Sequence, residues 1–327
     1  MELAVDRQLD RWLVQLHAVE QQALLALKQG RRRVGDARLA EHLAVHLIET
    51  ERHRAAVRRC LSARGRTRSR PIDLAASVNR AGFLIYGALS RDSPGKLLAD
   101  AFAYEFFEIA AYRMLERGAA ERGDVTVEAV ALSILRDEEA MAARLEDEFD
   151  RGVAASLRVA RCSAGETVLR HLCDLHALEA QAGVLFAAAS RFAGSARLAG
   201  CYRDQAARSR RQRASLGARI TSLNGAPSAL KTGVMRIAGA AWSVIWAAQR
   251  DTAAKLACFG YAALHLEIAS YELLRREAAQ TGDRETEALA VAHLESERAG
   301  AGRLGELLEE AALSSLVPSG MPLGASL

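Results

Sequence analysis

The segment EIAAYRMLERGAAERGD at Glu108–Asp124 recurs as EIASYELLRREAAQTGD at Glu267–Asp283, 159 positions later. The same offset aligns LHAVEQQ at Leu16–Gln22 with LHALEAQ at Leu175–Gln181, and no gap is needed between the two matches. A repeat of this length is typical of a duplicated domain rather than of a short solenoid unit. The 327 residues are enough for two domains of about 150 residues each. The sequence therefore predicts two tandem copies of one fold.

Each copy has the hydrophobic pattern of helices throughout. In the first copy, apolar residues recur at helical spacing along one stripe that begins at Leu9 and another that begins at Leu39. Leu97–Arg117 and Val125–Phe149 are expected to form two further long helices, separated by Gly123-Asp124. No convincing alternation with a period of two predicts a strand. Four long helices, with short loops within each pair and a longer crossover between the pairs, indicate a four-helix bundle.

The crossover of the first copy is expected to carry a shorter fifth helix at about Ile72–Leu89, after a Pro- and Arg-rich segment at Gly65–Pro71. The predicted fold is therefore all-α, with two tandem four-helix bundles that each have an extra short crossover helix. We expect one bundle over residues 1–155, the second over residues 160–313 and a flexible tail over residues 314–327.

Composition and charge limit the classes of function. A formal net charge of +4 does not by itself indicate nucleic-acid binding, and no nucleic acid is expected as a partner. The first ten residues contain no apolar signal core, so the expected location is the cytoplasm. The most apolar stretch, Ala238–Ala248, is too short to span a bilayer as a helix, and no membrane partner is expected. Five cysteines without Cys-x-x-Cys spacing disfavour a disulfide framework or a zinc ribbon, and they are interpreted as structural thiols: Cys60, Cys162, Cys173, Cys201 and Cys258.

Every long helix of the first copy carries a carboxylate in phase with its apolar stripe. A buried charge is costly unless it is paired or binds a metal ion. The candidate metal ligands are Glu20 on the first helix, His46, Glu49 and His53 on the second, Glu105 and Glu108 on the third, and Glu138 on the fourth. Carboxylates from four helices together with imidazoles are typical of a dinuclear iron or manganese site inside a bundle.

The spacing departs from the usual pattern of such sites, which places Glu-x-x-His on two helices. The nearest matches are His46-x-x-Glu49 and Glu49-x-x-x-His53, and no histidine lies near Glu138. One alternative is a buried polar network left from a metal-binding ancestor. Another is an error of one residue in helix phase, which would place these side chains at the surface. Because His46 and His53 are seven residues apart on one stripe, the spacing does not choose between them.

Four motifs, in order, resemble those of the YciE/YciF-like family of ferritin-like proteins. They are LHAVE, HLIETERH at His46–His53, EFFEIAAY with its counterpart LHLEIASY, and the Asp137-Glu138-Glu139 helix. The resemblance covers nearly the whole chain, twice. It implies ferritin-like bundles, a dinuclear metal centre and an association with bacterial stress responses. All seven candidate ligands match the family pattern, as do Asp137 and Glu139, whereas Phe106 stands where the family often has histidine.

The second copy keeps only part of this set. Glu179, Glu267 and Glu297 match Glu20, Glu108 and Glu138, whereas Gln205, Arg208, Gln212 and Leu264 replace His46, Glu49, His53 and Glu105. Three buried carboxylates need a partner, and the guanidinium of Arg208 could reach into the space that a metal ion would occupy and pair with two of them. We therefore expect a metal site in the N-terminal half only, and a degenerate, metal-free second half held by an arginine–carboxylate cluster.

These observations favour a ferritin-like dinuclear metalloprotein, with iron or manganese, that has a redox or oxidative-stress role. The alternative is a non-catalytic, stress-associated helical scaffold or interaction protein that has lost metal binding. A third hypothesis is the binding of a small apolar ligand between helices. Metal ions are the only partners that the residues indicate. No catalytic residue and no substrate can be assigned, and self-association is left open.

Other notable residues have simpler interpretations. Tyr112 and Tyr271 are expected to be core aromatic residues whose hydroxyl groups meet a carboxylate. The arginine-rich stretches, such as Arg31–Arg33 and Arg64–Arg70, are interpreted as solvated helix faces and loops. Met235–Ala248, with its two tryptophans, is expected to be buried against the bundle or between the two halves.

Overall fold

The computed structural model describes residues 2–66, 94–160, 163–247 and 252–316. Over these residues the chain forms helices and contains no strand, as the sequence predicts. The N-terminal half comprises α1 (Glu2–Arg33), α2 (Ala37–Ala63), α4 (Pro94–Arg122), α5 (Val125–Glu146) and α6 (Phe149–Val159). The C-terminal half comprises α7 (Ala164–Ala189), α8 (Ala196–Ser222), α9 (Ala229–Ala247), α10 (Thr252–Thr281), α11 (Arg284–Gly305) and α12 (Leu308–Leu316).

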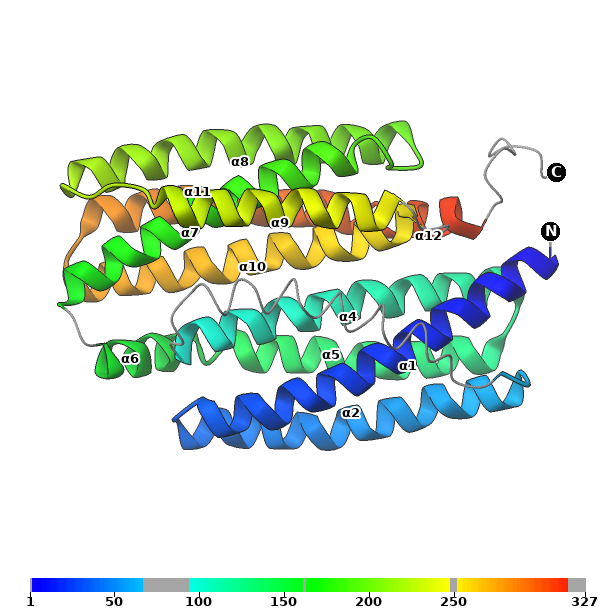
Figure 1. Ribbon diagram of the computed structural model, residues 1–327. Helices are drawn as coiled ribbons and strands as arrows, with labels where there is room; N and C mark the ends of the chain where they lie inside the picture. The colour runs from blue at the N-terminus through cyan, green and yellow to red at the C-terminus, as the bar shows by residue number, and fades with distance from the viewer. Residues whose placement is uncertain (1, 67–93, 161–162, 248–251, 317–327) are drawn as a thin grey trace.

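The long helices of each half run side by side, and the two bundles stack along their length (Figure 1). In the first half α1 packs against α2 and α4 against α5, and in the second α7 packs against α8 and α10 against α11. The main contact between the halves is made by α4 and α10, which are equivalent helices of the two copies. The short helices cross over, because α6 also packs on α10 and α12 packs on α4.

The Gly-Asp pair that ends each copy of the opening repeat reverses the chain. Gly123 and Gly282 have φ angles of 71° and 74°, a left-handed conformation that glycine adopts without steric cost at the end of a helix. Asp124 then accepts a hydrogen bond from the backbone of α5, and Asp283 does the same for α11. An aspartate side chain at this position satisfies a free N–H group of the new helix. The same device therefore sets the antiparallel helix pair in both halves.

The predicted helix and domain boundaries lie within a few residues of the ends of the observed helices. The helix α5 ends at Glu146, three residues before the predicted end of the fourth helix, and the fully buried Phe149 begins α6. The predicted boundary between the bundles, at residues 155–160, falls within and just after α6. The first three residues of the predicted tail, 314–316, belong to α12, and residues 317–327 lie outside the described part.

The predicted crossover helix at Ile72–Leu89 also lies outside the described residues. Its counterpart in the second half, α9, packs against α7. Met235 is 2% exposed whereas Ile237 is 71% exposed, so one face of the start of the apolar segment is buried against the bundle, one of the two expected arrangements. None of the described helices combines the length and the apolarity needed to cross a membrane.

The arginine-rich region after α2 is partly structural rather than merely solvated. Arg64 forms ion pairs with Asp10 and Asp124, each at 2.6 Å, and with Asp6 at 3.0 Å. These contacts tie the end of α2 to α1 and to the start of α5. The cysteines that the structure describes, Cys60, Cys173, Cys201 and Cys258, are free thiols, as the interpretation of structural thiols requires.

Candidate metal centre

The four long helices of the N-terminal half each bring a predicted residue to the middle of the bundle. Six of the seven candidates are no more than 3% exposed: Glu20, His46, His53, Glu105, Glu108 and Glu138. Such burial is rare for ionisable side chains unless they are paired or bind a metal ion. The inward phase predicted from the apolar stripes is therefore correct for these six, and both histidines point inward.

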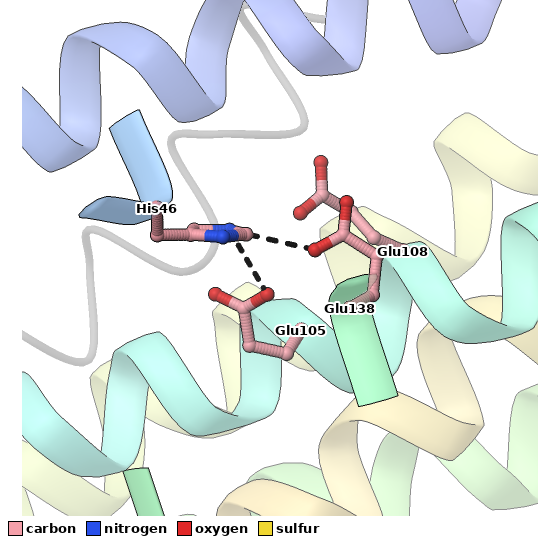
Figure 2. A group of neighbouring side chains, drawn as sticks. All are labelled: His46, Glu105, Glu108 and Glu138. Carbon is pink, nitrogen blue, oxygen red and sulfur yellow. Dashed lines mark ion pairs between the residues drawn. The ribbon is translucent and has the colours of Figure 1, made fainter. Parts of the chain in front are cut away.

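The buried side chains form two groups that share Glu138. Ligand atoms of His46, Glu105, Glu108 and Glu138 lie within 4.8 Å of one another, and so do those of Glu20, His53 and Glu138. Figure 2 shows the imidazole of His46 facing the carboxylates of the first group, with Nε2 3.2 Å from Glu105 and 3.4 Å from Oε2 of Glu138. The other oxygen of Glu138, Oε1, lies 3.0 Å from Nδ1 of His53. The two oxygens of this one carboxylate therefore face different groups.

The donor atoms of both groups fit a divalent cation. Within the described chain, no well-aligned hydrogen bond reaches either oxygen of Glu138, Oε1 of Glu108 or Oε2 of Glu20. An unpaired carboxylate oxygen in the interior costs free energy comparable to a lost hydrogen bond to a charged group. Oxygen and imidazole nitrogen are the atoms that iron and manganese bind in helical bundles. These buried His and Glu groups could thus hold metal ions.

Without metal, the carboxylates and imidazoles of the centre share protons. Burial, followed by the charge of Glu138, raises the pKa of Glu20 to about 8. Burial also raises the pKa of Glu138 to about 7 and that of Glu108 well above its usual range. Burial alone would lower the pKa of His46, but the charge and hydrogen bond of Glu105 outweigh it and raise this pKa to about 11. A cationic imidazole therefore neutralises part of the carboxylate charge.

Glu49 lies outside both groups of converging atoms. Its side chain is 13% exposed, and its Oε2 accepts a hydrogen bond from Nδ1 of His46 at 3.0 Å and from Nη2 of Arg144 at 2.8 Å. The hydrogen bond from His46 holds the pKa of the Glu49 carboxyl below its usual range. A carboxylate on the remote nitrogen fixes the orientation of an imidazole. The structure thus gives Glu49 an orienting position, where the sequence predicts a metal ligand.

Two further groups hold the candidate ligands in place. Tyr112 donates its hydroxyl hydrogen to Oε1 of Glu20, and Asp137 lies 3.0 Å from Nε2 of His53. The expected contact between a core tyrosine and a carboxylate is confirmed here, and again for Tyr271 and Glu179 at 2.6 Å. Arg144 was not predicted. Its spacing of seven residues from Asp137 places both on one face of α5, which was the available signal.

Glu139, which matches the family pattern, and Phe106, which departs from it, both lie away from the centre. Glu139 pairs with Arg113 at 2.9 Å on the surface. Phe106 and His265, which occupy equivalent positions in the two copies, stack with ring centroids 3.5 Å apart. Burial lowers the pKa of His265 to about 3, so this imidazole is neutral. Phe106 therefore belongs to the contact between α4 and α10.

The second half retains buried carboxylates but a different set of partners. Glu179, Glu267 and Glu297 are each 1% exposed, and Arg208 is 8% exposed. Over the described residues of this half, no group of His, Cys, Asp and Glu converges closely enough to suggest a metal site. Gly300 stands where the first half has Met141, and a Cβ at Gly300 would collide with the guanidinium of Arg208. The glycine thus provides the space that Arg208 fills.

The contacts of Arg208 differ in one respect from the prediction. Its Nη1 donates to Oε1 of Gln205, and among the described side chains no direct ion pair joins it to the three glutamates. Burial raises the pKa of all three glutamates, and the positive charge of Arg208 offsets part of that rise. The guanidinium therefore acts on the carboxylates through its charge rather than through the predicted bidentate hydrogen bonds. Its amide neighbour, Gln205, takes the place of His46.

Fold and site together define a class: tandemly duplicated all-helical bundle proteins with a buried cluster of His and Glu that could hold metal. The chain belongs to the family described as Domain of unknown function (DUF892), which matches residues 5–158 and again residues 163–316. The two matches confirm the family resemblance and the duplication inferred from the repeated motifs. No curated protein and no solved structure matches the chain.

Proposed function

We propose that this protein is a ferritin-like dinuclear metalloprotein that binds two iron or manganese ions in its N-terminal half and has a redox role in oxidative stress. The observation that carries the proposal is the shared position of Glu138, whose two oxygens face His46 and His53 respectively. One carboxylate between two imidazoles supports a pair of ions rather than a single one.

The charges of the surrounding groups also support two divalent ions. Four carboxylates are buried at the centre: Glu20, Glu105, Glu108 and Glu138. Their four negative charges would balance two ions of charge +2, with neutral imidazoles from His46 and His53 completing the donor set. When bound, the ions would supply one-electron redox chemistry and polarise an oxygen substrate.

The protein's own side chains would hold this centre in one geometry. Glu49 would retain the Nδ1 proton of His46, so that Nε2 remains free to bind, and Tyr112 would keep its hydrogen bond to Glu20. Binding would displace the protons that the imidazoles and carboxylates hold in the metal-free state. Metal affinity should therefore increase with pH.

Metal analysis of the full chain, purified without chelator and then reconstituted with Fe²⁺ or Mn²⁺, tests the proposal. We expect about two equivalents per chain. Glu138→Gln should reduce this stoichiometry sharply because it removes the shared carboxylate, whereas Glu297→Gln, at the equivalent position of the second half, should leave it unchanged. Anomalous scattering at the metal edges would then place both ions in the N-terminal bundle.

Two results would overturn the proposal. One is a reconstituted chain without metal, which would favour the alternative of a stress-associated scaffold that has lost metal binding. The fold itself does not require the full ligand set, because the second half forms the same bundle with Gln205, Arg208 and Gln212 in place of His46, Glu49 and His53. The other is an equal loss of metal from Glu138→Gln and Glu297→Gln.

A further inference from the structure

A mainly apolar cavity of about 180 Å³ lies between α1, α2 and α4. Its inner end is formed by His46, Glu105 and Glu108, which belong to the candidate metal centre. Its wall is largely hydrocarbon and includes Leu27, Leu39, Leu43, Leu98 and Ala101. The cavity therefore joins an apolar chamber to the buried donor atoms.

The size of the cavity is sufficient for a small organic molecule. An apolar protein cavity of roughly 150 Å³ stays dry and binds benzene. A chamber of about 180 Å³ can therefore hold a molecule with about six carbon atoms. Gln22, Gln29, Asp100 and Tyr104 also line the cavity, but most of its wall is hydrocarbon, where water gains no hydrogen bond.

The second half fills the equivalent space with its own side chains. At the offset of 159 residues, Phe186, Tyr202 and Gly260 stand in place of Leu27, Leu43 and Ala101. Both rings are fully buried, with centroids 6.1 Å apart. A Cβ at Gly260 would lie 3.2 Å from the ring of Phe186 and 3.5 Å from that of Tyr202. The three residues thus fit one another, and the two rings occupy the space beside Gly260.

The half that lacks the equivalents of His46, His53 and Glu105 therefore also has two rings in place of Leu27 and Leu43. Both copies keep the bundle, so packing alone does not require the smaller side chains in the first half. We infer that the cavity is a binding chamber for a small, uncharged, apolar molecule with one polar end, and that this end meets Glu105 and Glu108 beside the metal centre.

The burial of the inner end of the cavity further limits the chemical class of the molecule that can bind there. Glu105 and Glu108 are buried carboxyl groups, and Oε1 of Glu108 has no hydrogen-bond partner within the described residues. An anionic head group would lose its hydration at this buried end, whereas a neutral alcohol can form a hydrogen bond there. The assignment of this molecule as a substrate rests on the proposed metal function, but its binding depends only on the protein's own side chains.

Fluorine NMR of the full chain with a hexanol that carries a terminal trifluoromethyl group tests the inference. We expect saturable binding to both the metal-free and the metal-loaded protein, and at least tenfold weaker binding of the corresponding hexanoate to the metal-free form. The triple variant Leu27→Phe/Leu43→Tyr/Ala101→Gly installs the trio of the second half and should abolish hexanol binding. Leu25→Phe, at a half-exposed position of α1, is the matched control and should keep it.

Manganese loading provides a second measurement, because a paramagnetic ion beside the chamber should broaden the fluorine signal of bound hexanol. Ala101→Leu, which fills the chamber with a single change, replaces the triple variant if the latter does not fold. The inference is overturned if hexanol does not bind saturably to the wild type, or if a folded, filled variant binds it equally well. Saturable binding to a chain that takes up no metal would instead refute the proposed function alone.

Discussion

Arg208 should be essential to the stability of the second half, because it is the cation among three buried carboxylates. Removing one partner from a buried ion cluster costs about 3–5 kcal/mol, since it leaves an uncompensated charge. The glutamates of Arg208→Met can limit this loss only by binding protons. Their pKa values in the folded protein rise further, so the loss should grow as pH rises above the ordinary glutamate pKa of 4.5.

The magnitude depends on how many protons the folded variant retains. Each proton that the folded state binds in excess of the unfolded state lowers the free energy of unfolding by about 1.4 kcal/mol for each unit that the pH rises. Burial has already raised the pKa of Glu179 to about 8, so this carboxyl is largely neutral in the wild type at pH values well below 8. The additional loss in the variant should therefore come mainly from Glu297, because burial raises its pKa and the charge of Arg208 is the largest effect that opposes this rise.

Urea unfolding followed by circular dichroism at pH 5 and pH 8 measures this effect. We expect Arg208→Met to lose about 3–5 kcal/mol at pH 8 and clearly less at pH 5. Arg211→Met, an exposed position on the same helix, is the control and should change stability by less than about 0.5 kcal/mol. A loss below about 1 kcal/mol at pH 8, or an equal loss at both pH values, would refute the reasoning.

Two further predictions concern the N-terminal centre. The stability of the metal-free protein should fall as pH rises from about 4.5 towards 9. Folding raises the pKa of Glu138 to about 7, of Glu20 to about 8 and of His53 to about 9. A group with a raised pKa stabilises the folded state fully below its unfolded pKa, and it loses that contribution as pH rises through the folded value. Urea midpoints across this range check it, and a midpoint that rises with pH would contradict it. Tyr112→Phe should weaken metal binding by about 10–100-fold, because Glu20 loses the hydroxyl that orients it. Competition with a chelator measures this loss, and Tyr271→Phe, the equivalent change in the second half, should have no effect on it.

The sequence was sufficient to predict the inward carboxylates and the bundle that holds them. Helical periodicity fixes which side chains of one helix share a face, so Glu20 could be placed inward from the leucines around it. The internal repeat then supplied a comparison in which Arg208 replaces Glu49. Periodicity could not predict that Glu49 pairs with Arg144, since a contact between α2 and α5 depends on how the helices pack.

The order of residues along the chain determined the helices, their apolar faces, the duplication and the acidic residues that each face carries, because all of these are local or periodic properties. Only the tertiary structure decided that Glu138 lies between His46 and His53, that Phe106 stacks on His265, and that an aliphatic chamber ends at the carboxylates of one half and not the other. Those relations join residues up to 159 positions apart, and they depend on distances of a few ångströms that arise only when the helices pack together.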